Sequence, residues 1–209
     1  MTQKKVLIID YGMGNLQSVK NALEFLGYSA TVSDCQDDIP HFDAYILPGV
    51  GAFGEAMENL RQRDLIDILS EGVLHEKKPF LGICLGMQLL AESSVEMCYS
   101  EGLNWIPGHV IKIEVEEGIR LPHVGWNAIE IVKPVPLFNR IDSYSSYYFD
   151  HSYQLICDNR YVIAKCQYGR EIISAIQCDN IFATQFHPEK SQVKGLRLLR
   201  NFLNYVESS

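Results

Sequence analysis

The sequence predicts one α/β domain, in which a parallel sheet with helices on both faces carries an antiparallel addition. Two observations support this prediction. Apolar strand-like runs alternate with helical stripes in the first half of the chain, which is the order that produces a parallel sheet. After about Gly102 the runs become strand-like and often alternating, which indicates antiparallel strands. The 209 residues fit one domain of ordinary size, so residues 1–209 are expected to form a single unit.

The first half of the chain supplies the parallel strands and their helices. Residues 6–10 (VLIID) form a short apolar run, and a helix with apolar residues at helical spacing follows from Leu16 to its stop at Gly27. Further strands are expected near 28–32, at 44–48 (AYILP) and at 79–84 (PFLGIC). Helices are expected over 55–76 and over 87–93 (MQLLAES), directly after the last of these strands.

The second half is read as strands closed by one helix. The helix is expected over 195–206, where apolar residues share one side. The strand-like segments are 109–115 (HVIKIEV), 127–132 (NAIEIV), 147–156 (YYFDHSYQLI), 160–166 (RYVIAKC), 171–176 (EIISAI) and 180–186 (NIFATQF).

Composition argues against several kinds of partner. The formal net charge is −8 and no block of Lys and Arg interrupts it, so neither nucleic acid nor an anionic membrane is expected to bind. The longest apolar stretch, residues 80–91, is shorter than the roughly 20 residues of a membrane span. The N-terminal apolar run is too short for a signal-peptide core, so a cytoplasmic location is expected.

The six cysteines form no C-x-x-C pair, and no His cluster has the spacing of metal ligands. A disulfide scaffold would be unusual in a chain of this length, so the cysteines are expected to be reduced. No metal and no cofactor is expected.

Cys84 differs from the other cysteines because it lies in GICLG (82–86), a Gly-x-nucleophile-x-Gly turn between a predicted strand and a predicted helix. This turn would put the sulfur at a helix N-terminus, where the helix dipole favours a thiolate. The backbone N–H of Leu85 would then face a developing oxyanion. The alternative is a small buried cysteine that only packs at a strand end.

A nucleophilic thiol needs a base, and the base needs a group that orients it. QFHPE (185–189) ends the last predicted strand and places His187 two residues before Glu189. Alternatively, His187 is a surface histidine in a proline turn. His151, within DHSY, is the rival base. The elbow and QFHPE together favour catalysis.

A second glycine-rich turn has two interpretations. GVGAFG (49–54) matches G-x-G-x-x-G, and Asp67 and Glu71 lie near the distance of a ribose-binding carboxylate, which would indicate a dinucleotide-binding module. However, the motif follows the third predicted strand instead of the first, and Pro48 precedes it. Beside a thiol elbow, a loop that offers a backbone N–H to an oxyanion is the favoured interpretation.

GICLGMQLL together with QFHPEKS resembles the class I, triad-type glutamine amidotransferase domain. DYGMGNLQSV, LPGVGAFGEAM, LPHVGWN, DHSY and ATQFHPEKSQ are similar to the glutaminase subunits of imidazole glycerol phosphate synthase, over nearly the whole chain. The resemblance implies a flavodoxin-like fold with a mixed central sheet. It also implies a Cys84–His187–Glu189 triad that hydrolyses glutamine to glutamate and ammonia.

The resemblance further implies roles for other residues and a partner. The partner would be a (β/α)8-barrel cyclase subunit, which uses the ammonia to form imidazole glycerol phosphate and aminoimidazole carboxamide ribotide in histidine biosynthesis. The implied residues are Val50, Gly51 and Leu85 at the oxyanion, Gly51, Gln88, Ser152 and Tyr153 at glutamine, and Pro122, His123, Trp126 and Asn127 on the docking face.

One position departs from the pattern. Asp150 precedes HSY where the histidine-pathway subunits more often carry an apolar residue. Close paralogues supply ammonia for the amidination of surface-polysaccharide sugars by the same triad chemistry, so that pathway stays open as an alternative. A catalytically dead scaffold is disfavoured because all three triad positions are intact.

Overall fold

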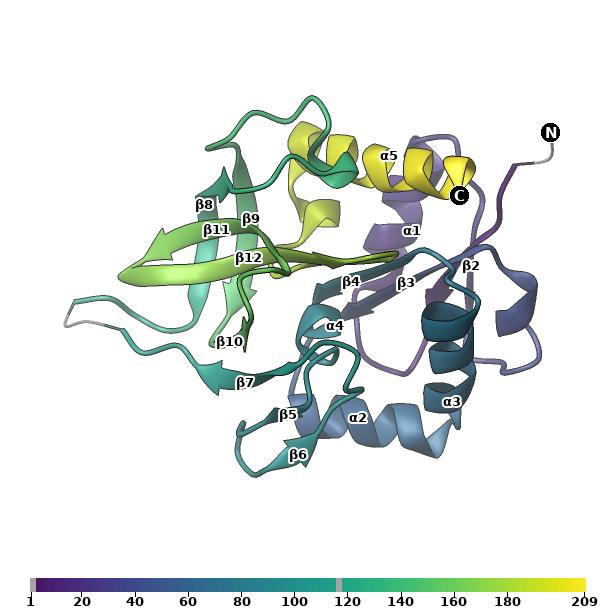
Figure 1. Cartoon of the computed structure of the whole chain (residues 1–209), viewed down its shortest axis with the longest axis horizontal. Coiled ribbons are helices and arrows are strands. Elements are labelled where there is room, and N and C mark those ends of the chain that lie inside the picture. Colours follow the sequence, from purple (N-terminus) through teal and green to yellow (C-terminus); the bar gives the residue numbers. More distant parts are fainter. Residues whose placement is uncertain (1–2, 116–117) are drawn as a thin grey trace.

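A computed structural model describes residues 3–115 and 118–209. Its centre is a nine-stranded sheet with the order β2-β1-β3-β4-β13-β12-β11-β8-β9 (Figure 1). The first five strands in this order are parallel: β2 (Ala30–Ser33), β1 (Val6–Ile9), β3 (Ala44–Gly49), β4 (Phe80–Cys84) and β13 (Ile181–Thr184). The expected parallel sheet is therefore present, and its last member comes from the far end of the chain.

Antiparallel strands extend the same sheet. They are β12 (Arg170–Cys178), β11 (Val162–Tyr168), β8 (His123–Ile131) and β9 (Ser146–His151). A second sheet has the order β10-β7-β5-β6 and contains β10 (Tyr153–Cys157), β7 (Gly108–Lys112), β5 (Ser93–Ser94) and β6 (Ser100–Glu101). The segment expected as one strand over 147–156 thus divides at Ser152 between the two sheets.

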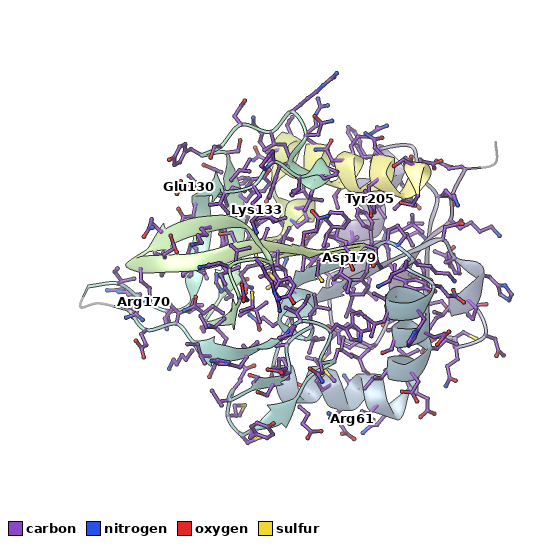
Figure 2. The ribbon with its side chains drawn as sticks, in the orientation of Figure 1. Arg61, Glu130, Lys133, Arg170, Asp179 and Tyr205 are labelled. Carbon is purple, nitrogen blue, oxygen red and sulfur yellow. The ribbon has the colours of Figure 1, made fainter. Side chains whose placement is uncertain are left out.

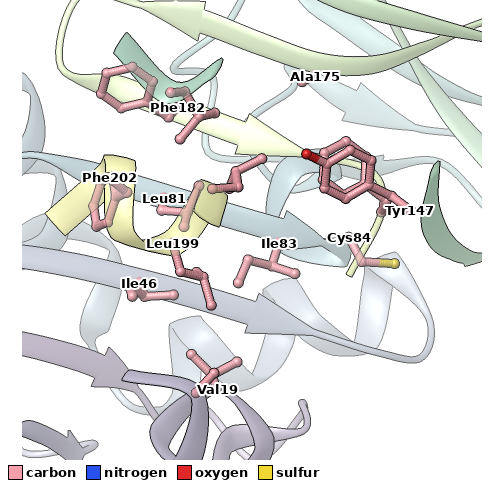
Figure 3. Close-up of a cluster of buried hydrophobic side chains, with 14 of the residues drawn as sticks. Val19, Ile46, Leu81, Ile83, Cys84, Tyr147, Ala175, Phe182, Leu199 and Phe202 are labelled. Carbon is pink, nitrogen blue, oxygen red and sulfur yellow. The ribbon is translucent and has the colours of Figure 1, made fainter. Parts of the chain in front are cut away.

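Helices cover both faces of the parallel strands, as Figure 1 shows. Helices α1 (Leu16–Phe25) and α5 (Gln192–Ser208) pack on one face, and α2 (Phe53–Gln62) and α3 (Leu65–Ser70) on the other. Strand β1 follows the two-residue period of a strand, because Val6 and Ile8 join the first apolar cluster and Leu7 and Ile9 the second. Figure 3 shows part of the first cluster, with Cys84 at the end of β4.

Two expected helices are shorter than the sequence pattern indicated. The helix expected over 55–76 breaks at Asp64, which has a φ of +51°, and after α3 it continues only as a π-helical turn (Glu71–His75). The helix expected after Cys84 is the single turn α4 (Leu85–Gln88). It does not continue, because the carbonyl groups of Leu89, Leu90 and Ala91 accept hydrogen bonds from the backbone of residues 103–106 instead of from a next helical turn.

The remaining helical elements are short. The 3₁₀ helices are Ile39–His41, Pro136–Phe138 and Pro188–Lys190. Figure 2 shows Arg170 at the tip of the β11–β12 hairpin, where its guanidinium donates to Glu114 at 2.7 Å. No helix in the described parts of the chain is both long and apolar enough to cross a membrane.

Candidate active site

Cys84 stands at the sharp turn between β4 and α4. Its φ of +54° and ψ of −107° are unfavourable for a residue with a side chain, and its side chain is only 5% exposed. Neighbouring backbone approaches closely, since a Cβ atom on Gly86 would overlap the carbonyl oxygen of Leu47, and one on Gly82 would lie 2.7 Å from that of Gly86. The glycines on both sides of Cys84 are therefore required by packing, as expected of a nucleophile elbow.

His187 lies next to this turn because β13 runs beside β4 in the sheet. The imidazole is 2% exposed, and its Nδ1 lies 2.8 Å from Oε1 of the buried Glu189. Three hydrogen bonds hold the backbone of His187: its N–H donates to the Tyr148 carbonyl at 2.9 Å, and its carbonyl accepts from the Ser191 hydroxyl at 2.6 Å and from the Lys190 N–H at 3.1 Å. Nε2 has no hydrogen-bond partner within the described residues, so it is free to exchange a proton with a thiol or a substrate.

The pKa of His187 reflects its neighbours. Burial by itself lowers this pKa, but interactions with Cys84 and Glu189 outweigh burial and raise it to about 10. These two neighbours therefore favour the protonated form of the His187 ring. By contrast, burial raises the pKa of the Cys157 and Cys166 thiols to about 11, which makes those two cysteines poor nucleophiles.

His151, the rival base, has different surroundings. Its Nδ1 lies 2.8 Å from the carbonyl oxygen of Tyr153, and its Nε2 lies 3.1 Å from Nδ1 of His123. No carboxylate of residues 3–115 or 118–209 is hydrogen-bonded to it, and burial lowers its pKa to about 4. Both ring nitrogens are therefore already paired, and the geometry favours His187 as the proton carrier.

A cavity of about 280 Å³ opens in front of Cys84. This volume is at the small end for ligand sites and suits a single amino acid. Its lining includes the residues expected at the oxyanion and at glutamine, together with Cys84, Pro122 and three residues to which the resemblance gave no role: Glu96, Asp150 and His151. The complete lining is Val50, Gly51, Cys84, Leu85, Gln88, Glu96, Pro122, Asp150, His151, Ser152 and Tyr153.

Gln185 is a site residue that sequence reasoning missed. Its side chain is fully buried, its Nε2 lies 3.6 Å from Sγ of Cys84, and its Oε1 accepts a hydrogen bond from Gln88 at 3.0 Å. The available signal was its position directly before FHPE, at the end of a strand that adjoins the elbow.

Glu96 was also missed, and it bears on the glycine-rich turn. Its Oε2 accepts a hydrogen bond of 2.8 Å from the backbone N–H of Phe53, at the N-terminus of α2. A dinucleotide phosphate would have to occupy this helix end, and a carboxylate already there would repel it. Gly49 instead pairs with Cys84 across β3 and β4, which places the 49–51 loop beside the thiol.

The residues expected on a docking face divide between two faces of β8. Because side chains alternate along a strand, Trp126 points outward and is 49% exposed, whereas His123 points inward and is only 2% exposed. Asn127 lies on the same inner face, where it contacts His123 at 3.2 Å, and Pro122 lines the cavity. The His123 side chain thus faces the interior of the protein, and the place of this residue on a docking face stays a prediction.

No group of three or more His, Cys, Asp or Glu side chains that could hold a metal ion occurs among residues 3–115 and 118–209.

Comparison with known proteins identifies the family of this chain. The family model described as Glutamine amidotransferase class-I matches residues 7–206, so the chain belongs to that family. Solved structures share the fold at low sequence identity. A protein of Thermoplasma acidophilum described as a putative GMP synthase subunit has a TM-score of 0.76 at 19% identity over 100% of this chain and 96% of that one. PurLQS from Thermotoga maritima has a TM-score of 0.77 at 17% identity over 98% and 100%.

Within that class, the chain belongs to the imidazole glycerol phosphate synthase subunits named HisH. HisH 1 of Campylobacter jejuni (strain RM1221) is 48% identical over 198 residues, which are 95% of this chain and 98% of that protein. HisH 2 of Vibrio vulnificus (strain YJ016) is 47% identical over 204 residues, 97% of this chain and 95% of that one. The predicted fold class and the predicted family are both confirmed.

Proposed function

We propose that this chain hydrolyses glutamine to glutamate and ammonia, with Cys84 as the nucleophile, and passes the ammonia to a (β/α)8-barrel cyclase subunit in the cytoplasm. The observation that supports it best is a single arrangement. A thiol on a strained turn lines a cavity of about 280 Å³, and a buried His187–Glu189 pair follows the neighbouring strand β13.

The first half of the reaction releases ammonia. The Cys84 sulfur attacks the side-chain carbonyl carbon of glutamine, and the C–S bond forms as the carbonyl oxygen becomes an oxyanion. Backbone N–H groups of Leu85 and of the 49–51 loop donate to that oxygen, which is a contribution of roughly 3 kcal/mol for each donor. His187 gives its proton to the leaving nitrogen, the C–N bond breaks, and a thioester remains on Cys84.

The second half releases glutamate. A water molecule gives a proton to His187 as its oxygen attacks the thioester carbon, and the C–S bond then breaks. The sulfur leaves as a thiolate beside the protonated imidazole, which is the state that starts the next cycle. Glu189 contributes by fixing the ring orientation and stabilising the imidazolium, without moving a proton itself.

The polar ends of glutamine find complementary groups in the cavity. One oxygen of Glu96 is used by the Phe53 N–H, and the other oxygen is left for the α-ammonium group. Gln88, Ser152 and Tyr153 face the same space with Gly51 and supply polar contacts for the amide and the carboxylate. Glu96 is thus added to the substrate residues that the sequence indicated.

The proposed partner follows from the relatives, which are named as subunits of imidazole glycerol phosphate synthase. The cyclase subunit would close the imidazole ring with the ammonia, in histidine biosynthesis. On this chain its docking face would include Trp126 and Val124, both half-exposed on the outer face of β8 beside the cavity residue Pro122. The complex is expected to be a heterodimer.

One residue keeps the polysaccharide alternative in view. Asp150 is exposed on β9, pairs with Val124 in the sheet and lines the cavity, so its charge would face whichever partner docks there. Mixing the chain with each candidate barrel protein and measuring glutamine-dependent product decides between the two pathways.

The test of the proposal is glutamine hydrolysis by the complex of this chain with the cyclase subunit. Cys84→Ala should abolish glutamate formation, whereas the complex should still make product from ammonium salts at high pH. Cys35→Ala is the matched control, because Cys35 is exposed and lies outside the cavity, and it should leave the rate unchanged. Glutamine should also protect Cys84 from iodoacetamide. Retained hydrolysis in Cys84→Ala would remove this thiol from the reaction.

A further inference from the structure

Two buried histidines lie next to each other beside the cavity, and the triad uses neither. His123 on β8 and His151 on β9 are directly opposite each other in the sheet, and their side chains are 2% and 6% exposed. Nδ1 of His123 lies 3.1 Å from Nε2 of His151. The His123 ring is held between two aromatic rings, with centroids 4.6 Å away at Phe149 and 3.9 Å away at Tyr168.

The neighbours of this pair determine which nitrogen carries each proton. The Tyr153 carbonyl oxygen can only accept, so Nδ1 of His151 must carry a hydrogen to bond with it at 2.8 Å. In a neutral ring Nε2 of His151 then accepts, so Nδ1 of His123 donates to it. Nε2 of His123 in turn accepts from the Asn127 amide at 3.2 Å, and the second hydrogen of that amide goes to the Gln167 carbonyl at 2.9 Å.

The resulting chain of hydrogen bonds runs in one direction, from Asn127 through His123 and His151 to the Tyr153 carbonyl. A proton added to either ring would place two N–H donors against each other. Burial opposes such a proton and lowers the pKa of each histidine to about 4, with a further lowering by His151 at His123 and by His187 at His151. Both rings are therefore neutral at physiological pH, with the hydrogen on Nδ1.

The chain of hydrogen bonds ends at the groups that surround Cys84. The Tyr153 carbonyl also accepts from Nε2 of Gln88 at 3.0 Å, and the same nitrogen donates to Oε1 of Gln185 at 3.0 Å. Both hydrogens of the Gln88 amide are thus committed, which leaves its oxygen as the group available to a ligand in the cavity. Gln185 is oriented in turn, with Nε2 directed at Sγ of Cys84.

We infer that His123 and His151 are positioning residues that, as neutral rings with the hydrogen on Nδ1, hold the Tyr153 carbonyl and through it fix the orientation of the Gln88 amide for glutamine. The inference rests on the proposed glutaminase function. It also gives Asn127 a role, because its amide on the inner face of β8 donates the first hydrogen bond of this chain, to His123.

The first test reads the tautomers directly. The full-length chain labelled with ¹⁵N-histidine is studied by NMR through the two-bond couplings of the ring nitrogens, and His123→Asn and His151→Asn identify the signals. Between pH 6 and 8, both rings should show a protonated Nδ1 and an unprotonated Nε2. A hydrogen on Nε2 of either ring, or a positive charge on either ring at pH 7, overturns the inference.

The second test reads glutamine binding in the complex with the cyclase subunit. His123→Leu removes the donor to His151, so the KM for glutamine should rise about tenfold while kcat changes less than threefold. His123→Asn keeps an N–H donor near the position of Nδ1, so it should restore KM to within about threefold of the wild type. His109→Leu, an exposed position on the strand beside β10, is the matched control and should leave KM unchanged.

A double-mutant cycle separates positioning from general damage to the fold. In a Gln88→Ala background the amide to be positioned is gone, so adding His123→Leu should not raise KM further. Additive effects, or equal KM values for His123→Leu and His123→Asn, overturn the positioning role in an active complex. A wild-type complex that hydrolyses no glutamine overturns the proposed function instead, and the positioning role with it, while the NMR result still decides the tautomers.

Discussion

His187 and Glu189 divide the work of a base between two residues. The Nδ1–Oε1 distance of 2.8 Å fixes the ring, and the unpaired Nε2 is the atom that moves protons. Ser191 and Tyr148 hold the backbone of His187, so the ring position does not depend on Glu189 alone. Removing the His187 ring and removing the Glu189 carboxylate should therefore lower glutamine turnover by different amounts.

His187→Asn should lower glutamine turnover on the order of 10²-fold or more, because the proton no longer reaches the leaving nitrogen. Glu189→Gln should cost less, since it removes charge and orientation but keeps the proton carrier. The measurement is glutamate release by the complex under saturating glutamine. His151→Asn is the comparison, and a larger loss of kcat there than in His187→Asn would show that His151 is the base.

The neutral pair His123 and His151 also predicts how stability depends on pH. Burial, the largest cause, lowers each pKa to about 4, and His187 lowers that of His151 further while Tyr153 and Asp150 oppose it. An unfolded histidine has a pKa of about 6.5, so between pH 6.5 and 4 the unfolded chain binds protons that the folded chain does not. The two neutral histidines therefore contribute fully to the free energy of unfolding above pH 6.5, and this contribution is lost as the pH falls towards 4.

Urea unfolding at pH 7, 6 and 5 measures this effect. The free energy of unfolding of the wild type should fall on acidification, and it should fall less in His123→Asn and in His151→Asn. The carboxylates that also titrate in this range are common to all three proteins, so the difference between them isolates the histidines. If the free energy of unfolding fell equally with pH in the wild type and in both variants, the two buried rings would not be neutral.

At the scale of elements, we expect the 49–51 loop at the end of β3 to adopt two peptide orientations. Gly49 and Gly51 flank Val50, Gly51 has a φ of +108°, and Val50 is 41% exposed. The peptide groups between the two glycines can therefore rotate at low cost. One orientation aims a carbonyl at the oxyanion and the other an N–H. Docking of the cyclase subunit, occupied by its own substrate, would then activate the site by favouring the second orientation.

Gly51→Val should reduce the stimulation of glutamine hydrolysis by the occupied partner more than it reduces binding, because a β-branched residue disfavours positive φ. Gly49 is a poorer site for this test, since a Cβ atom there would overlap the Tyr11 hydroxyl. Gly27→Val is the control, as Gly27 also has a positive φ but faces open space after α1. Turnover with and without partner is measured beside Kd. An isolated wild-type chain already at full rate would exclude the switch.

The lengths of the elements show how tertiary contacts override local pattern. Residues 87–93 carry a helical pattern, but only α4 forms, because the backbone of residues 103–106 takes the carbonyl groups that a longer helix needs. The same packing brings Glu96 to the end of α2 and so to the cavity. Hydrophobic periodicity does not predict these contacts, because the residues in contact lie more than ten positions apart in the chain.

On the scale of the whole molecule, the outer face of β8 is the expected surface for the cyclase subunit. Trp126→Ala should weaken the complex at least tenfold, since a half-exposed tryptophan contributes strongly when an interface buries it. The Tm of the isolated chain should stay within about 2 °C, because about half of the Trp126 side chain is exposed and its loss removes little buried surface. Calorimetric titration and thermal unfolding measure the two quantities.

Phe25→Ala is the control for that prediction. Phe25 is 78% exposed at the end of α1, so its loss also removes exposed aromatic surface but should leave Kd unchanged. A lower Tm for Trp126→Ala with an unchanged Kd would instead mean that the tryptophan serves the fold.

The sequence by itself determined the features that depend on neighbouring residues. Local patterns of this kind are the parallel strands, the glycine-flanked turn at Cys84 and the two-residue spacing of His187 and Glu189. Each can be interpreted without knowledge of the tertiary structure. The family was also accessible, since its motifs are short strings distributed along the chain.

Only the tertiary structure decided which distant side chains meet. Pairing of β13 with β4 brings Gln185 to Cys84, and pairing of β8 with β9 places His123 opposite His151 and turns it away from the surface. The physical reason is register: a shift of one residue in strand pairing exchanges the inner and outer faces of a strand, and only the packed sheet fixes that shift.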